Sequence, residues 1–213
     1  MMPRGKRRAA AWKKIESKLQ VADIILTRDT RSALSGSIRK ILGSYWNHAV
    51  IVFFVPNKSR LFKNILIISA EDHGIEIHRI QKYTKHFDFL ELGVKRVPGL
   101  SEEVRARVLS FLMNNVDIPY DYLRLLGFLL KFVELKLKGG NKHVKDFLIN
   151  KDTFVCSSFI QKAFYNAVAK EQKQAVVFKD GMDKRDLPLA LEEVTPADIA
   201  RSKNCEWIYN PHD

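Results

Sequence analysis

Hydrophobic positions along the chain form short strand-like runs and longer stretches with helical spacing. Runs rich in β-branched and aromatic residues predict an opening strand at Asp23 and further strands over 48–55, 65–70, 74–79 and 88–97. Pro56-Asn57-Lys58-Ser59 predicts a turn between the strands at 48–55 and 65–70. Short turns join neighbouring antiparallel strands, so the pattern predicts an antiparallel sheet.

Helix-start signals and helical spacing predict helices on the same chain. Ser101 is the expected N-cap of a helix that runs to about Asn115, with Glu102 and Glu103 in its first turn. Thr195-Pro196-Ala197-Asp198 predicts another helix start, with proline at the first helical position. Further helices are expected over 10–19, 32–42 (ending at Gly43), 119–138 and 153–170. The predicted fold class is therefore α+β, with an antiparallel sheet packed against helices.

Length and composition fit one domain. The chain has 213 residues, 46% of them hydrophobic, which suffices for a single core. We expect residues 1–20 to form a basic N-terminal extension with a short helix, and residues 21–213 to form the domain. The two cysteines, Cys156 and Cys205, do not indicate a disulfide framework, which favours a reducing compartment. No run has the roughly 18 to 20 apolar residues of a membrane span, and no signal-peptide core is visible, so the expected location is cytoplasmic or peripheral at a membrane.

Positive charge is the unusual feature of the composition. Lys and Arg number 36 against 24 Asp and Glu, a formal net charge of +12. Six basic residues precede the first acidic one: Arg4, Lys6, Arg7, Arg8, Lys13 and Lys14. They predict contact with an anionic membrane surface or another acidic partner, and a solvated tail is the alternative. Nucleic-acid binding is not supported beyond charge, because no zinc-finger spacing or RNP-like motif is present.

The stretch from Leu123 to Lys138 has charges at helical spacing that leave a broad apolar face. It is too short and too charged to span a membrane. An ordinary core-facing helix is the favoured interpretation, and an interfacial helix or the wall of an acyl-chain pocket is the alternative.

Two residues carry candidate chemistry. Cys156 lies in Phe-Val-Cys-Ser-Ser-Phe, at the first turn of a predicted helix that Asp152 or Thr153 would cap. The unpaired N–H groups and positive dipole end of a helix favour a thiolate there. His48 begins a predicted strand, and its neutral imidazole would take the thiol proton. A small buried cysteine and a structural histidine are the alternatives.

The order of these segments resembles that of the circularly permuted NlpC-type papain-like cysteine hydrolases, which share a superfamily with the lecithin:retinol acyltransferase-like enzymes. The matching segments are Ala22-Asp23-Ile24-Ile25, the His48 strand, 67–71, 74–78, 94–96, Pro119-Tyr120, the cysteine motif and 195–200. Histidine precedes cysteine, the reverse of the papain order. The chain departs from the family at Ala22, where glycine is usual, and in the long apolar stretch between Tyr122 and Cys156. The resemblance implies a permuted papain-like sheet with the cysteine at a helix N-terminus.

The remaining site residues follow from this comparison and from general triad chemistry. A third member should accept a hydrogen bond from the other nitrogen of His48, and Glu71 is the candidate, with His73 as the competitor. The Cys156 backbone N–H is a candidate oxyanion donor. Tyr120 resembles a family tyrosine that lines the site, and Ser157 is a further weak candidate. No metal-ligand spacing recurs, so no metal and no cofactor are expected.

These residues predict a thiol-dependent hydrolase that acts through a thioester acyl-enzyme. The resemblance implies that it cleaves an amide bond, in a peptide, a cell-wall polymer or an N-acyl compound. Val155-Cys156-Ser157-Ser158 is more similar to the permuted hydrolases than to the acyltransferases, whose nucleophile typically follows asparagine. One alternative is a membrane-surface phospholipase or acyltransferase on lipid esters, which the basic N-terminus and the apolar face of 123–137 would serve. A second alternative is a catalytically inactive binding protein.

Overall fold

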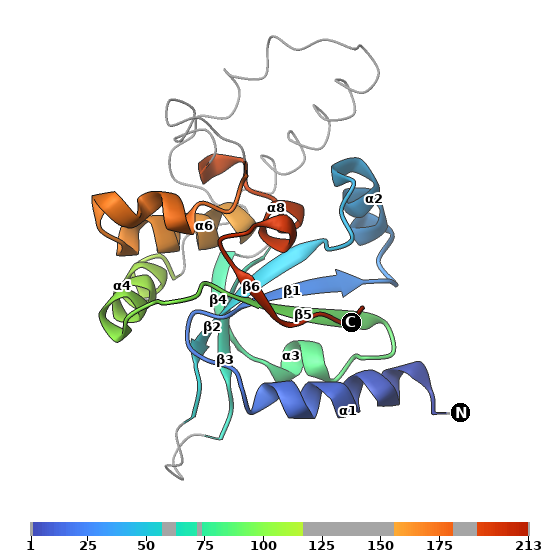
Figure 1. Ribbon diagram of the computed structural model, residues 1–213. Coiled ribbons are helices and arrows are strands. Elements are labelled where there is room, and N and C mark those ends of the chain that lie inside the picture. The colour runs from blue at the N-terminus through green and yellow to red at the C-terminus, as the bar shows by residue number, and fades with distance from the viewer. Residues whose placement is uncertain (1, 57–62, 72–73, 117–155, 181–190, 213) are drawn as a thin grey trace, which may run out of the picture.

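The computed structural model describes residues 2–56, 63–71, 74–116, 156–180 and 191–212. These residues form an α+β fold in which helices cover both faces of one antiparallel sheet (Figure 1). The sheet has six strands in the order β4-β3-β2-β1-β5-β6. Their bounds are β1 Ile24–Asp29, β2 His48–Phe54, β3 Leu66–Glu71, β4 Gly74–Arg79, β5 Leu90–Arg96 and β6 Glu206–Tyr209. The predicted fold class and the five predicted strands are confirmed.

Alternation along the strands divides the core into two layers. Ile24 and Leu26 of β1 belong to the cluster that includes Val108 of α4 (Glu102–Met113) and Phe159 of α6 (Cys156–Ala167). Ile25, between them, belongs to the opposite cluster. That cluster includes residues of α1 (Arg4–Glu16) and α3 (Gln81–Thr84). Successive side chains of a strand point to opposite faces, so each strand contributes to both layers.

Capping residues place three helices where the sequence predicts them. Ser32 caps α2 (Ala33–Leu42), and Gly43 ends it in a left-handed conformation. Ser101 accepts a hydrogen bond from the Val104 N–H at the start of α4. Thr195 and Asp198 form a reciprocal capping box at the start of α8 (Pro196–Arg201).

Other elements differ from the predictions. Helix α1 begins at Arg4 rather than near residue 10, because Arg, Lys and Ala are all good helix formers. Of the helix predicted over 153–170, the described part is α6, which is followed by the 3₁₀ helix η1 (Lys170–Val176). The short elements α3 and β6 were not predicted. The helix predicted over 119–138 lies outside the described residues.

Ala22 adopts the backbone conformation that its glycine-like position requires. Its φ is 71°, the one positive φ of a non-glycine residue in the described ranges. The Ala22 N–H donates to the Val52 carbonyl, which fixes the turn into β1 against β2. This left-handed conformation costs an L-residue roughly 1 to 2 kcal/mol, so the surrounding contacts must offset that strain.

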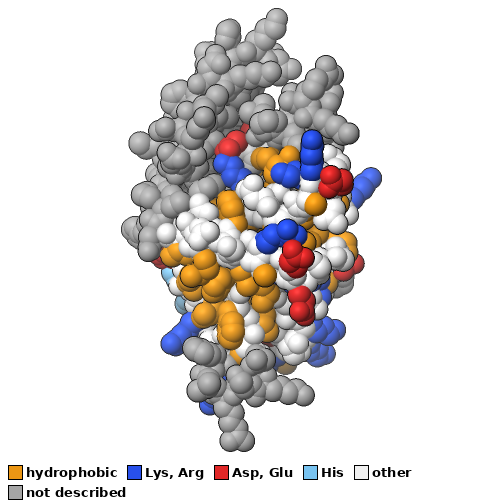
Figure 2. Space-filling view, turned by 90° about the vertical axis from the view of Figure 1, so that its left-hand side faces the viewer, with side chains coloured by type: hydrophobic (Ala, Val, Ile, Leu, Met, Phe, Trp, Pro, Cys, Tyr) orange, Lys and Arg blue, Asp and Glu red, His pale blue; other side chains and the backbone are white. Residues whose placement is uncertain are grey.

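The outer surface carries both hydrophobic and charged side chains. Figure 2 shows the side that lies at the left of Figure 1, where hydrophobic side chains gather beside scattered charged ones. Two of the exposed large hydrophobic residues are Ile77 of β4 and Met113 of α4. Within the described ranges, every helix is too short or too polar to cross a membrane.

A close approach of two tryptophans requires glycine in β5. A Cβ on Gly93 would lie 2.9 Å from ring atoms of Trp46 and of Trp207. These rings, whose centroids are 6.0 Å apart, therefore pack directly over the strand backbone.

Gly93→Ala should destabilise the fold by about 1 to 3 kcal/mol, because rigid aromatic rings would have to move to accept the methyl group. Urea unfolding of the two proteins measures this difference. Gly36→Ala is the matched control, since only the flexible end of Arg39, at 3.9 Å, lies near the added methyl group in α2. The control should be neutral or slightly stabilising. Equal stability of Gly93→Ala and wild type would contradict the packing argument.

Candidate functional site

The antiparallel order of the strands brings three predicted site residues to one end of the sheet. His48 is the first residue of β2, and Glu71 is the last residue of its neighbour β3. Helix α6 packs across β2 and β3, and Cys156 is its first described residue. The Cys156 thiol and the His48 ring form a hydrogen bond. Residues separated by more than 100 positions therefore meet at this end.

A chain of hydrogen bonds extends from the other side of the imidazole. His48 Nε2 lies 2.9 Å from Ser69 Oγ, and Ser69 Oγ donates to Glu71 Oε1 at 2.8 Å. Tyr83 of α3 donates its hydroxyl proton to the same carboxylate oxygen at 2.9 Å. Lys82 donates to the second oxygen, Oε2. Glu71 thus receives three donors and holds Ser69 against the histidine.

Ser69, rather than Glu71, occupies the position directly beside the imidazole. The sequence predicts that Glu71 accepts the hydrogen bond from His48 itself, and the structure places a hydroxyl between them. Residues 69 and 71 point to the same face of the strand about 7 Å apart, and Ser69 is the one within hydrogen-bond distance of the ring. That period of two was the available sequence signal for Ser69. Tyr83 and Lys82 come from a short helix that the sequence did not reveal.

The directions of these hydrogen bonds determine which nitrogen faces the sulfur. Burial alone would raise the pKa of Glu71, but hydrogen bonds from Lys82 and Ser69 and the nearby His48 lower it to about 2. An ionised carboxylate only accepts, so the Ser69 hydroxyl must donate to it. Ser69 Oγ then accepts from His48 Nε2–H. The Nδ1 atom is left to exchange a proton with Cys156.

The electrostatics favour an ion pair between the thiol and the imidazole. Burial alone would raise the pKa of Cys156, but the charge and hydrogen bond of His48 and the backbone N–H of Ala49 lower it. Burial likewise opposes a charged His48, yet the Cys156 thiolate and the Glu71 carboxylate raise the pKa of the ring. The regular pairing of β2 with β3 begins at Ile51, so Ala49 lies beyond the paired positions, where its N–H can face the sulfur.

Cys156 is buried, with 5% of its surface exposed. The residue belongs to the core layer that also contains Ala49, Phe159 and Ile160. Low local polarity strengthens the interaction of the sulfur with His48. The oxygen of Ser157, another predicted site residue, lies 3.7 Å from the sulfur and is also buried. Tyr120, His73, Asp152 and Thr153 lie outside the described residues.

A buried glutamine joins α6 to the segment that follows it. The Gln161 side-chain amide donates to the Val176 carbonyl at 2.8 Å, and its oxygen accepts from the Phe178 N–H at 2.7 Å. Gln161 is fully buried, so these two bonds satisfy polar atoms that would otherwise be costly. The segment after α6 is thereby held against the helix that carries Cys156.

Comparisons with known proteins bear on the fold alone. No family model matches the chain, and no curated protein sequence matches it. Among solved structures, the chain is similar to the metalloprotein yiiX from Escherichia coli O157:H7, with a TM-score of 0.56 over 90% of this chain and 97% of that one, at 17% sequence identity. Within the described part of this chain, no three His, Cys, Asp or Glu side chains are grouped to hold a metal ion.

The two cysteines offer a matched test of the ion pair, because Cys205 is also buried, with 3% of its surface exposed. Burial raises the pKa of Cys205 even though Lys95 lies beside it. In Cys205→Ala protein, iodoacetamide should therefore alkylate Cys156 with a midpoint below the ordinary thiol value of about 8.5. In Cys156→Ala protein, the midpoint for Cys205 should lie above it. Intact-protein mass spectrometry against pH measures both.

Adding His48→Ala to the Cys205→Ala protein should move the Cys156 midpoint upward, since burial then acts without the imidazolium. Coincident pH profiles for Cys156 and Cys205 would contradict the ion pair. An unchanged profile after removal of His48 would do the same.

Glu71 should make the stability of the fold depend on acid pH. Its pKa of about 2 in the folded protein is below the ordinary glutamate value of about 4.3, so its stabilising effect is complete above pH ~4.3 and is lost as pH falls through 2. Glu71→Gln removes the charge. The difference in unfolding free energy between wild type and Glu71→Gln, up to about 2 kcal/mol, should shrink across that window in urea titrations. A difference that stays constant from pH 5 to 2 would show that Glu71 has an ordinary pKa.

Proposed function

We propose that this protein is a cysteine hydrolase that cleaves amide bonds through a thioester acyl-enzyme. The observation that carries the proposal is the hydrogen-bonded series Cys156, His48, Ser69 and Glu71. In it a buried thiol with a lowered pKa contacts a histidine whose second nitrogen is held by an oriented hydroxyl. Nucleophile, base and orienting group are the three parts that activated nucleophiles need.

The reaction starts from the thiolate and imidazolium. The Cys156 sulfur attacks the carbonyl carbon, and His48 Nδ1–H gives its proton to the leaving amine as the C–N bond breaks. The neutral imidazole then takes a proton from water, whose oxygen attacks the thioester. The C–S bond breaks, the carboxylic acid product leaves, and the thiolate and imidazolium are restored.

Ser69 and Glu71 act as positioning residues in this scheme. Ser69 accepts from Nε2–H and so keeps Nδ1 directed at the sulfur. The ionised Glu71 stabilises the imidazolium through the serine and by its charge, as its contribution to the raised His48 pKa indicates. Tyr83 and Lys82 fix the carboxylate and keep it ionised.

The proposed architecture is the permuted papain-like fold, with Cys156 at a helix N-terminus. Helix α6 on an antiparallel sheet whose β2 strand begins with the histidine supports it. In this arrangement the dipole of α6 favours the thiolate, and the Cys156 backbone N–H is positioned to donate to the oxyanion of the tetrahedral intermediate.

The test combines substrate discovery with variants of the series. Cell lysate incubated with wild type and with Cys156→Ala should differ in amide-containing compounds consumed only by the wild type. With a compound so found, Cys156→Ala and His48→Ala should lose activity by about 10⁴-fold. A quenched wild-type reaction should show an acyl adduct on Cys156 by mass spectrometry.

Ser69→Ala should lower kcat by roughly 10- to 100-fold, because one hydrogen bond to a charged ring is lost. The pH–rate profile should shift with it, an effect that a purely structural serine would not produce. Ser110→Ala, on the exposed side of α4, is the matched control. Consumption of phospholipid esters without any amide would favour the lipid alternative. A Cys156 that reacts with no compound would favour the binding protein.

A further inference from the structure

A second charge cluster, outside the proposed catalytic series, surrounds Glu91 at the start of β5. Its carboxylate is 2% exposed, and the guanidinium groups of Arg4, Arg8 and Arg28 all contact the single oxygen Oε1. The Arg4 and Arg28 contacts measure 2.8 and 3.5 Å. The other oxygen, Oε2, accepts from the Tyr45 hydroxyl. Arg28 also lies over the Tyr45 ring, 4.1 Å from its centroid.

This cluster carries more positive than negative charge. Three guanidinium groups against one carboxylate leave an excess of two positive charges. Burial and the charges of Arg4 and Arg28 lower the pKa of Arg8, although Glu91 acts in the opposite direction. The neighbouring Asp29 directs its carboxylate oxygen Oδ1 to the backbone N–H groups of Arg31 and Ser32.

Donor groups in the cluster remain available. The Nε atom of Arg28 is buried and has no hydrogen-bond partner among the described residues. Arg4 is 67% exposed and uses only Nη2 in the contacts seen in the described ranges. Arg8, by contrast, is engaged by the carbonyls of Phe87 and Leu90 and by Glu91. The cluster therefore combines an unused buried donor with a solvent-facing one.

We propose that Arg4, Arg8 and Arg28 form a binding site for a phosphate-type oxyanion. The fork of a guanidinium matches two phosphate oxygens, and a phosphate monoester with close to two negative charges matches the excess charge. The anion would bind on the side of Arg4 that faces solvent. The ligand is a free phosphorylated compound or a phospholipid headgroup, which share this chemistry.

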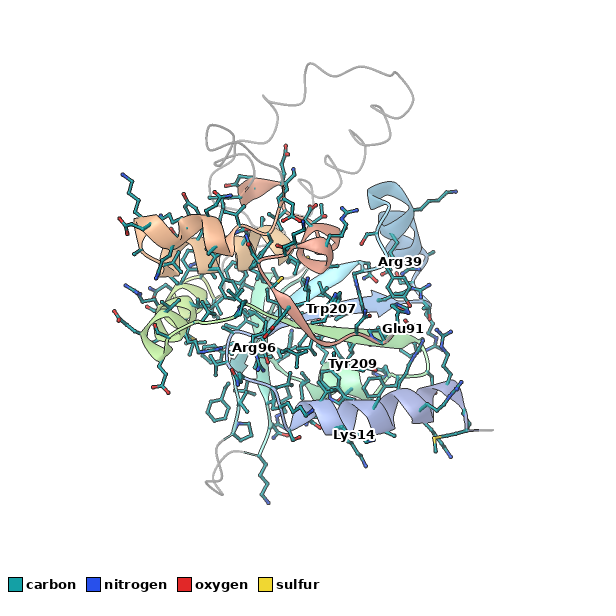
Figure 3. All side chains as sticks on the ribbon, viewed as in Figure 1. Lys14, Arg39, Glu91, Arg96, Trp207 and Tyr209 are labelled. Carbon is teal, nitrogen blue, oxygen red and sulfur yellow. The ribbon has the colours of Figure 1, made fainter. Side chains whose placement is uncertain are left out.

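The site lies near the proposed catalytic series. Arg28 of β1 pairs with Glu91 of β5, and the preceding residue, Thr27, pairs with His48 of β2. The His48 and Glu91 backbones are separated by two inter-strand spacings and by one residue along the strand. This amounts to about 10 Å. Figure 3 shows Glu91 at the sheet end near α2 and the first turns of α1. A phosphate on a substrate would thus lie at the same end of the sheet as His48 and Cys156, a consequence that rests on the proposed function, whereas anion binding does not.

Inorganic phosphate is the probe for the site. Isothermal titration of the full chain at pH 7 and fixed ionic strength, balanced with sodium chloride, should give saturable binding to wild type. Arg4→Gln should weaken it roughly tenfold, as one charged hydrogen bond is lost. Arg107→Gln, which removes an equal charge from an exposed ion pair on α4, should leave it unchanged. Glu91→Gln should tighten it, because the competing carboxylate charge is gone, and phosphate should raise the Tm of that variant more than that of wild type.

Vesicles of phosphatidylcholine with phosphatidic acid distinguish the two sources of phosphate. Sedimentation that depends on Arg4 and is competed by inorganic phosphate would identify a headgroup, and phosphate binding without sedimentation would identify a free compound. Absence of saturable phosphate binding, or equal affinities for Arg4→Gln and Arg107→Gln, would overturn the site. Cys156→Ala should bind phosphate as wild type does, so failure of the hydrolase proposal and failure of the anion site give different results.

Discussion

The arrangement of the candidate site depends on keeping one partly buried carboxylate ionised. Glu71 is surrounded by donors from three side chains, and each of these bonds requires the carboxylate to act only as an acceptor. The same requirement determines the direction of the next hydrogen bond, because Ser69 must donate to Glu71 and can then only accept from His48. The positions of the protons, which leave Nδ1 facing Cys156, are therefore a consequence of burying Glu71 beside Lys82 and Tyr83.

Local signals made much of the fold predictable. Helix α2 was bounded by Ser32 and Gly43, and α4 by Ser101, because caps act through atoms within a few residues. Strand β6 was missed for the opposite reason. It has only four residues, and its partner β5 lies more than 100 positions earlier, so nothing local marks it. The short helix α3 likewise follows β4 directly without a side-chain cap.

A site residue was predictable from the sequence where its neighbours in the chain mark its position. Cys156 is the first described residue of α6, and His48 is the first residue of β2. The structure brings these two side chains into contact. Ser69 was missed because serine on a strand is common and its role depends on which neighbour reaches the imidazole. Lys82 and Tyr83 could not be assigned, since their position depends on how α3 packs against β3. Tertiary contacts, not propensity, select these residues.

Glu71 and Glu91 lie at the same end of the sheet, but their different partners give these two carboxylates different roles. Glu71 accepts from the Lys82 ammonium group and from two neutral hydroxyl groups, so its negative charge is available to stabilise a positive imidazole. Glu91 has three cationic partners, so its charge is outweighed and the cluster remains positive. A negative group near His48 and a positive group two strands away create a field along the sheet end. For the hydrolase that we propose, that field would favour a substrate whose scissile bond lies at Cys156 and whose anionic group points toward Arg28.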